Sequence, residues 1–181
     1  SALAWWFPFP HRAGTPKFPD TPKEIFGTPV ENFHLYENLL RRVGAQGTYG
    51  IRAVLWHQGE SDGIFNTPAE LYCSGMQFLI RQLNKDLGWK VPWVVARASH
   101  LPNSTDRQRR NVIEGQRLIW DRGVALQGPS TDGFLGPQYR YDEVHFSAYG
   151  LQVHASRWFA ALWAHFFADC SLALRYRSGK R

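Results

Sequence analysis

The chain has 181 residues, with 44% hydrophobic and 20% charged side chains, which is ordinary for one globular domain with its own core. The net charge is +6, but the basic residues are scattered apart from residues 107–110 and 175–181. No nucleic-acid-binding motif accompanies them and no apolar run is long enough to span a membrane, so neither is expected as a partner. Cys73 and Cys170 fit no metal-binding spacing and form either a disulfide or two buried thiols.

The first 30 residues are rich in proline and in aromatic side chains. The prolines rule out a long helix, and the aromatic residues between positions 5 and 9 are too apolar for a free tail. We therefore predict that residues 1–30 form an irregular segment packed on the domain. The domain itself is predicted to cover residues 31–170, followed by a basic tail at residues 171–181.

Helices and strands are predicted to alternate along the domain. One-sided apolar patterns predict helices at residues 31–43, 68–87, 104–121 and 147–167, and short apolar runs predict strands at residues 51–57, 91–98 and 123–127. The second helix carries the start signals Thr67 at the N-cap, Pro68 and Glu70, and it ends at Gly88. This alternation predicts an α/β fold with a parallel sheet between layers of helices. The buried face of the last helix is predicted to contain Leu151, Ala155, Trp158, Leu162 and Phe166.

A polar block, Trp-His-Gln-Gly-Glu-Ser-Asp at residues 56–62, follows directly on the first predicted strand. Open α/β sheets bind ligands beyond the carboxyl ends of their strands. Within this block, Gln58, Gly59 and Glu60 combine an amide donor, a flexible backbone and a carboxylate. A buried core has little use for such a group, so we interpret it as a functional site.

Asp142 and His145 form a second polar block just before the last predicted helix. Because Asp142 lies three residues before His145, a single turn can bring the carboxylate to the imidazole, where it would fix the tautomer and stabilise the imidazolium. The alternative is a chance pairing in front of an ordinary helix start.

Together these blocks, over roughly residues 35–165, resemble the SGNH-hydrolase superfamily. More narrowly, they resemble the sialate O-acetylesterases and the acetylxylan esterases of carbohydrate esterase family six. The resemblance implies a three-layer α/β/α sandwich of flavodoxin-like type, in which this chain supplies the last three of the five parallel strands. It also implies a serine ester hydrolase that releases acetate from acetylated sugars and needs no cofactor.

The resemblance assigns roles to the residues of both blocks. His145 is the candidate general base, and its acid partner is Asp142 or, as in some family members, Glu60. Gln58, with the adjacent Gly59, is the candidate donor to the oxyanion and substrate. Alternatively, Gln58 bonds the backbone and pins its loop.

Other residues near these blocks have weaker functional readings. We expect His57 to be structural, and His100 either lines the same rim or is structural as well. A metal site made of His57, Glu60 and Asp62 lacks a consistent ligand pattern, so no metal is expected.

A nucleophile is not found in this sequence. The family's Gly-Gln-Ser or Gly-Asp-Ser block is absent, and Ser1, Ser61, Ser130 and Ser147 lack its glycine context or lie in the wrong block. If the strand at residues 51–57 is the family's third, one of its edges is left open. We therefore predict a companion polypeptide that carries the first two strands and the nucleophilic serine.

The function predicted from these observations is that of a carbohydrate O-acetylesterase acting on an acetylated carbohydrate. A catalytically inactive glycan-binding module and a lipase-like or thioesterase-like hydrolase of the same fold remain as alternatives. Xylan, sialic acid and other acetylated sugars are all open as substrates. A secreted or periplasmic location is expected, because acetylated polymers are normally met outside the cell.

Overall fold

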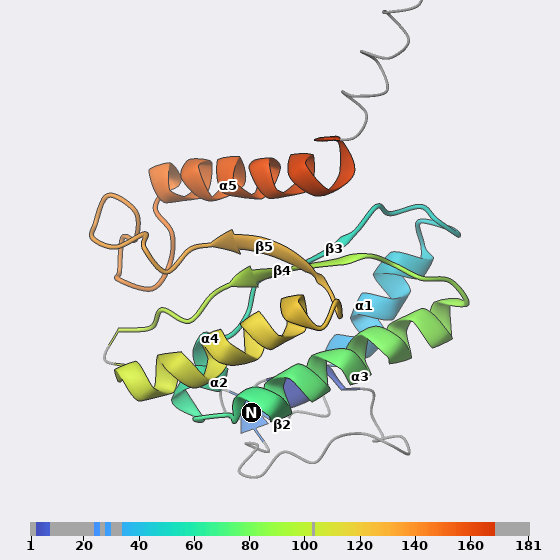
Figure 1. Ribbon diagram of the computed structural model, residues 1–181, viewed down its shortest axis with the longest axis horizontal. Coiled ribbons are helices and arrows are strands. Elements are labelled where there is room, and N and C mark those ends of the chain that lie inside the picture. Colours follow the sequence, from blue (N-terminus) through green and yellow to red (C-terminus); the bar gives the residue numbers. More distant parts are fainter. Residues whose placement is uncertain (1–2, 8–23, 26–27, 30–33, 103, 169–181) are drawn as a thin grey trace, which may run out of the picture.

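The computed structural model describes residues 3–7, 24–25, 28–29, 34–102 and 104–168. Three parallel strands form the central sheet in the order β3-β4-β5 (Figure 1). They are β3 (Val54–Trp56), β4 (Trp93–Arg97) and β5 (Leu126–Ser130). This arrangement confirms the predicted α/β fold with a parallel sheet. Two short strands, β1 (Glu24–Ile25) and β2 (Thr28–Pro29), form a separate antiparallel pair.

Helices cover the two faces of the central sheet unequally. On one side lie α1 (Leu35–Gly44), α2 (Glu60–Ile64), α3 (Ala69–Leu87) and α4 (Asp106–Asp121). Of the described helices, α5 (Ala148–Phe166) alone lies on the other side (Figure 1). The main core lies on the side of α3 and α4, where residues such as Tyr72, Met76, Leu79, Val112 and Ile119 are fully buried.

Part of the N-terminal segment joins this core. A 3-10 helix, η1 (Leu3–Trp6), packs against α1 and α3, and the side chains of Leu3 and Phe7 are buried. Most of the segment predicted at residues 1–30 lies outside the described residues, as do Cys170 and the predicted tail at residues 171–181. Cys73 is a buried free thiol.

The last strand begins later than predicted. We expected a strand at residues 123–127, but β5 begins at Leu126. The reason is the end of α4, which closes through Gly123 in a left-handed conformation (φ 63°), with its N–H donating to the carbonyl of Trp120. The residues before Leu126 therefore complete the helix. The first predicted strand also contracts, from residues 51–57 to β3, and α2 after it was not predicted.

The start of α3 differs from the prediction, whereas its end agrees. Thr67 is not the N-cap, because its hydroxyl donates to the Asp62 carboxylate (2.8 Å) and Pro68 occupies the cap position. Gly88 ends the helix as predicted, in a left-handed conformation with φ 75°.

The face of α5 is much more exposed than predicted. Trp158 is buried against Val94 and Ala96 of the sheet, and Leu162 and Phe166 are partly buried there. The prediction that Leu151 and Ala155 are buried was wrong, since both are exposed. The physical reason is that a sheet of three short strands offers too little surface to cover a helix of 19 residues. No helix in the described part of the chain is long and apolar enough to cross a membrane.

Candidate active site

The loop that carries Gln58 leaves the carboxyl end of β3 and enters α2 at Glu60. Gly59 lies between them in a tight space. A Cβ atom at this position would lie 2.1 Å from the carbonyl oxygen of Ala98 and 2.4 Å from Nε2 of Gln116. Only glycine fits there without moving the neighbouring backbone, so Gly59 fixes the path of the loop.

Gln58 has its amide held at both ends. Its Nε2 donates to the Asp62 carboxylate at 2.6 Å, and the Tyr72 hydroxyl lies 3.3 Å from its Oε1. The same hydroxyl donates to the backbone oxygen of Gln58 at 2.7 Å. These bonds resemble the loop-pinning alternative, yet an amide nitrogen has two hydrogens and the second remains for another acceptor. An oriented donor of this kind suits an oxyanion.

Asp62 supports this loop from inside the protein. It is fully buried and accepts hydrogen bonds from the backbone N–H of Leu3 (2.9 Å), from Gln58 and from Thr67. These partners occupy the carboxylate that the sequence had suggested as a weak metal ligand. Within the described residues, no group of three His, Cys, Asp or Glu side chains is placed to hold a metal ion.

Asp142 and His145 meet in one turn after β5. The carboxylate of Asp142 lies 2.7 Å from Nδ1 of His145 and accepts a second bond from the His145 backbone N–H at 2.6 Å. These two bonds from His145, the ring bond first, lower the pKa of Asp142 to about 2. A carboxylate on Nδ1 favours the tautomer with a bare Nε2, which is the form a general base needs.

The Nε2 atom of His145 has no hydrogen-bond partner among the residues that the structure describes. None of the described serines forms a hydrogen bond with Nε2 of His145. Ser99 donates to Asp132, and Ser147 caps α5 and donates to the carbonyl of Gln138. The structure therefore brings His145 and Asp142 together without adding a candidate nucleophile from the described residues.

Glu60 and His57 face each other rather than His145. One carboxylate oxygen of Glu60 accepts from the N–H of Gly59 at 3.0 Å, and the other lies 4.0 Å from Nδ1 of His57. Burial lowers the pKa of His57, and the neighbouring Glu60 partly offsets this effect. In this geometry Asp142, and not Glu60, is the carboxylate bonded to His145.

Contacts between the two blocks run through the ends of the strands. Nε2 of His57 lies 3.1 Å from the Thr131 hydroxyl, and its ring centroid lies 6.1 Å from that of Phe146, the residue after His145. Nε2 of His100 lies 3.3 Å from the carbonyl oxygen of Glu143. The two blocks, far apart in sequence, are thus neighbours at the carboxyl ends of the parallel strands.

Two site residues were missed by the sequence reasoning. Arg140 is buried, with 4% of its surface exposed, and its guanidinium donates to carbonyl oxygens of the loop that carries His145. Asp132 accepts from the backbone N–H groups of Ser99 (2.7 Å) and His100 (3.1 Å) and joins that loop to the end of β4. No local spacing marks either residue, since Asp132 binds backbone that is distant in sequence and Arg140 binds carbonyls of an irregular loop without a periodic pattern.

Comparisons with known proteins place the chain in a family. The family model for carbohydrate esterase, sialic acid-specific acetylesterase, matches residues 23–164. The protein named probable carbohydrate esterase At4g34215, from Arabidopsis thaliana, is 45% identical over 67 residues, which are 34% of this chain and 26% of that protein. The chain thus matches well under two thirds of that relative's length, and no solved structure gives a significant match. Because the family match covers most of the chain, the protein belongs to the carbohydrate esterase family of sialic acid-specific acetylesterases.

Proposed function

We propose that this protein is the base-carrying part of a carbohydrate O-acetylesterase. The observation that carries the proposal is the bond of 2.7 Å between Asp142 and His145, beside the oriented amide of Gln58 at the same edge of the sheet. Nε2 of His145 takes the proton of a serine hydroxyl while the serine oxygen attacks the acetyl carbonyl carbon. Gln58 donates to the oxyanion that forms.

The remaining steps follow from the same groups. When the tetrahedral intermediate collapses, the sugar oxygen leaves and takes the proton from His145, and the acetyl group stays on the serine. A water molecule then repeats the attack with the help of His145 and releases acetate. Asp142 holds the imidazole in the right tautomer in both halves, and we assign it, in preference to Glu60, as the acid partner.

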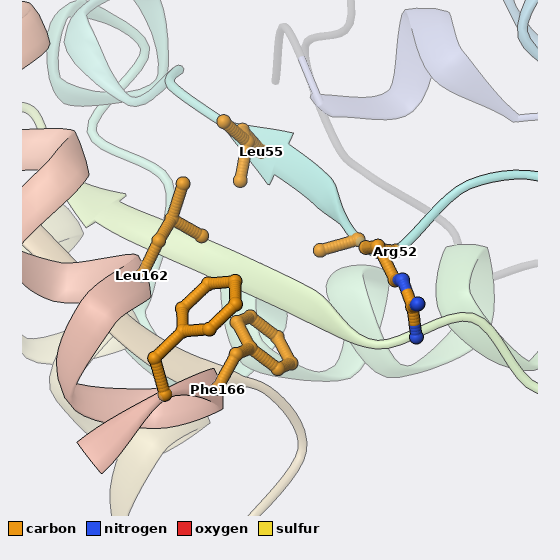
Figure 2. Close-up of a pocket in the computed structure, with 6 residues that line it drawn as sticks. Arg52, Leu55, Leu162 and Phe166 are labelled. Carbon is orange, nitrogen blue, oxygen red and sulfur yellow. The ribbon is translucent and has the colours of Figure 1, made fainter. Parts of the chain in front are cut away.

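We further propose that a companion polypeptide supplies the serine. Support comes from β3, which pairs with β4 on one edge and has no strand beside its other edge within the described residues. Leu55 on this strand is 46% exposed. A cavity of about 630 Å³ opens between the strand and α5, and in Figure 2 Leu162 and Phe166 of α5 lie across it from Leu55. Its lining residues are Arg52, Ala53, Leu55, Leu162, Phe166 and Phe167.

The occupant that fits this surface is a strand followed by a helix. A strand added parallel to β3 would satisfy its free backbone groups and would end level with Gln58, where the site needs a nucleophile. The helix after that strand would cover the cavity and the exposed aromatic side chains of α5, among them Phe159 and Trp163. This occupant joins the missing strand and the missing serine in a single segment.

An activity assay on a chromogenic acetate ester, beside an intact-mass spectrum of the denatured sample, tests the proposed function. With the companion present, His145→Ala is expected to lower kcat by roughly 10⁴-fold and Gln58→Ala by roughly 10²–10³-fold. The matched control is His34→Ala, because His34 is exposed and lies at the start of α1, outside the site. Full activity in His145→Ala would exclude the proposed base.

A glycan-binding module without catalysis is the second candidate function. Tyr141 favours it, because this side chain is 67% exposed and its ring lies 5.9 Å from that of His145, at an angle of 20°. Exposed aromatic rings of this kind bind sugars without any nucleophile. This candidate would be favoured if the chain by itself binds acetylated sugar and hydrolyses no ester, either by itself or after the companion is added.

A further inference from the structure

We propose that Arg140 is a positioning residue, which holds Asp142 and His145 in their bonded geometry by fixing the peptide group between Val144 and His145. This inference rests on the proposed function, because that function assigns His145 and Asp142 as the base and its acid partner. Arg140 itself touches neither substrate nor base.

The burial of Arg140 is the first observation. Its side chain is 4% exposed, yet no described acidic side chain forms an ion pair with it. Burying an unpaired cation is costly unless its donors are satisfied. Here Nε donates to the carbonyl of Phe134 at 2.8 Å, Nη1 to that of Val144 and Nη2 to that of Thr131 at 3.4 Å. The ring of Phe146 lies 4.4 Å from the guanidinium carbon.

The second observation concerns a single peptide group. A peptide unit is planar, so the carbonyl of Val144 and the N–H of His145 point in opposite directions and turn together. Arg140 binds that carbonyl, while that N–H donates to Asp142 at 2.6 Å. The guanidinium therefore sets the plane that presents both the N–H and the following imidazole to the carboxylate.

The third observation is that this turn is exposed and strained. Apart from Arg140, it is held by bonds within the turn, such as that from the N–H of Tyr141 to the carbonyl of His145, and by Nε2 of His100, which lies 3.3 Å from the carbonyl oxygen of Glu143. The side chains of Asp142 and His145 are 41% and 68% exposed, and Glu143 adopts a left-handed conformation with φ 67°, which is unfavourable for a non-glycine residue. Through Thr131, Arg140 ties the turn to the sheet, because the N–H of Thr131 donates to the carbonyl of Arg97 at the end of β4.

The charges around Arg140 agree with a fixed cation at this place. Burial lowers its pKa, while Glu60, Asp132 and Asp142 raise it. These three carboxylates approach from the start of α2, from the loop after β5 and from the turn itself. Replacing Arg140 removes the group that joins Val144 to Phe134 and Thr131, which are themselves joined by a backbone hydrogen bond.

Carbon-13 NMR titration of the Asp142 carboxyl in the full chain tests the inference without any need for activity. In the native protein its pKa is expected near 2, and in Arg140→Met it is expected to return toward its ordinary value of 3.8. Arg140→Lys keeps the charge but cannot reach three carbonyls at once, so a smaller rise is expected. The matched control is Arg117→Met, an exposed arginine on α4 that is bound to Glu114 and Asp121.

In the active complex with the companion, Arg140→Met is also expected to lower kcat at least about 10-fold while KM changes little, since the base is misplaced and substrate contacts are kept. An unchanged Asp142 pKa and kcat, with only a lower melting temperature, would overturn the inference and leave Arg140 a purely structural role. If Arg140→Met does not fold, the Asp142 pKa and the kcat of Arg140→Lys test the inference in the same way. An inert native complex would count against the proposed function but not against the inference about Arg140, because the titration depends on the contact between Asp142 and His145 and not on activity.

Discussion

At the scale of single residues, the site depends on side chains that bind backbone. Asp142 binds the backbone and the ring of His145, Arg140 binds loop carbonyls, and Asp62 binds the N–H of Leu3 as well as the amide of Gln58. The bond between Asp142 and His145 was predictable, because a separation of three residues within one turn restricts both groups to the same space. The bonds of Arg140 and Asp62 were not, since their partners are brought together by α2 and by the loop after β5.

His154 gives a pH dependence at this scale. Burial, and then the nearby positive charges of His57 and Arg140, lower its pKa from 6.5 to about 4. Its neutral Nε2 accepts a hydrogen bond from Nε1 of Trp158 at 2.8 Å, which a protonated ring could not do. In the unfolded chain the ring binds a proton below pH 6.5, whereas in the folded protein it does so only near pH 4. The free energy of unfolding should therefore decrease as the pH falls through this window.

Urea unfolding at a series of pH values measures this effect. His154→Gln keeps an acceptor for Trp158 but cannot be protonated, so the loss of stability between pH 6.5 and 4 is expected to become smaller. Part of the slope should remain, because burial also lowers the pKa of His57. The exposed His34→Gln serves as control and should leave the slope as it is. An identical slope in His154→Gln would show that this imidazole does not carry the dependence.

At the scale of elements, apolar spacing predicted where helices and strands lie, and contacts between them decided where they end. The one-sided apolar spacing of α3 and α4 corresponds to buried faces in the structure. These faces contain Tyr72, Met76, Leu79 and Leu83 on α3 and Val112 and Ile119 on α4. The start of β5 shifted because Gly123 closes α4. Thr67 does not cap α3, because its hydroxyl donates to the carboxylate of Asp62. The formation of α2 brings these two side chains together.

Gly115 tests the packing of α3 against α4. A Cβ atom at this position would lie 3.0 Å from Cβ of Tyr72 and 3.1 Å from the carbonyl oxygen of Ala69. Because both atoms are rigid, Gly115→Ala should push the helices apart and destabilise the protein by about 1–3 kcal/mol. The control is Gly44→Ala at the end of α1, where a Cβ atom has nothing within 4 Å and the change should be near neutral. Equal midpoints of thermal unfolding for the two variants would contradict this account of the contact.

At the scale of the whole molecule, helices cover the two faces of the sheet to different extents. The face under α3 and α4 is covered by the main core. The other face holds α5 alone among the described helices (Figure 1). A cavity remains there beside β3 (Figure 2). Several large apolar side chains of α5 point away from this packing. Among them are Leu151, Phe159 and Trp163, which are 54%, 65% and 50% exposed.

If the proposed companion covers this side, polar substitutions there should weaken its binding. Trp163→Gln combined with Phe159→Ser is expected to raise the dissociation constant of the complex at least about 10-fold, because aromatic side chains dominate interface energies. Analytical ultracentrifugation of the mixed chains gives this constant. Tyr49→Ala is the matched control, since Tyr49 is 73% exposed but its ring lies against Trp89, at 5.2 Å, and does not line the cavity under α5. Unchanged binding in the double variant would place the companion elsewhere.

The sequence by itself determined the fold class, the order of the longer helices and the three parallel strands, the family and the two polar blocks, because these follow from local spacing and short motifs. It also identified Asp142 and His145 as a pair, since both lie in one turn. Only the tertiary structure decided what holds the pair in place and how far α5 is covered. Asp62 binds the N–H of Leu3, which is far away in sequence, and Arg140 binds carbonyls of an irregular loop. The exposure of α5 depends on the width of the sheet beneath it. Such contacts leave no periodic mark in a sequence, because chain folding alone brings them together.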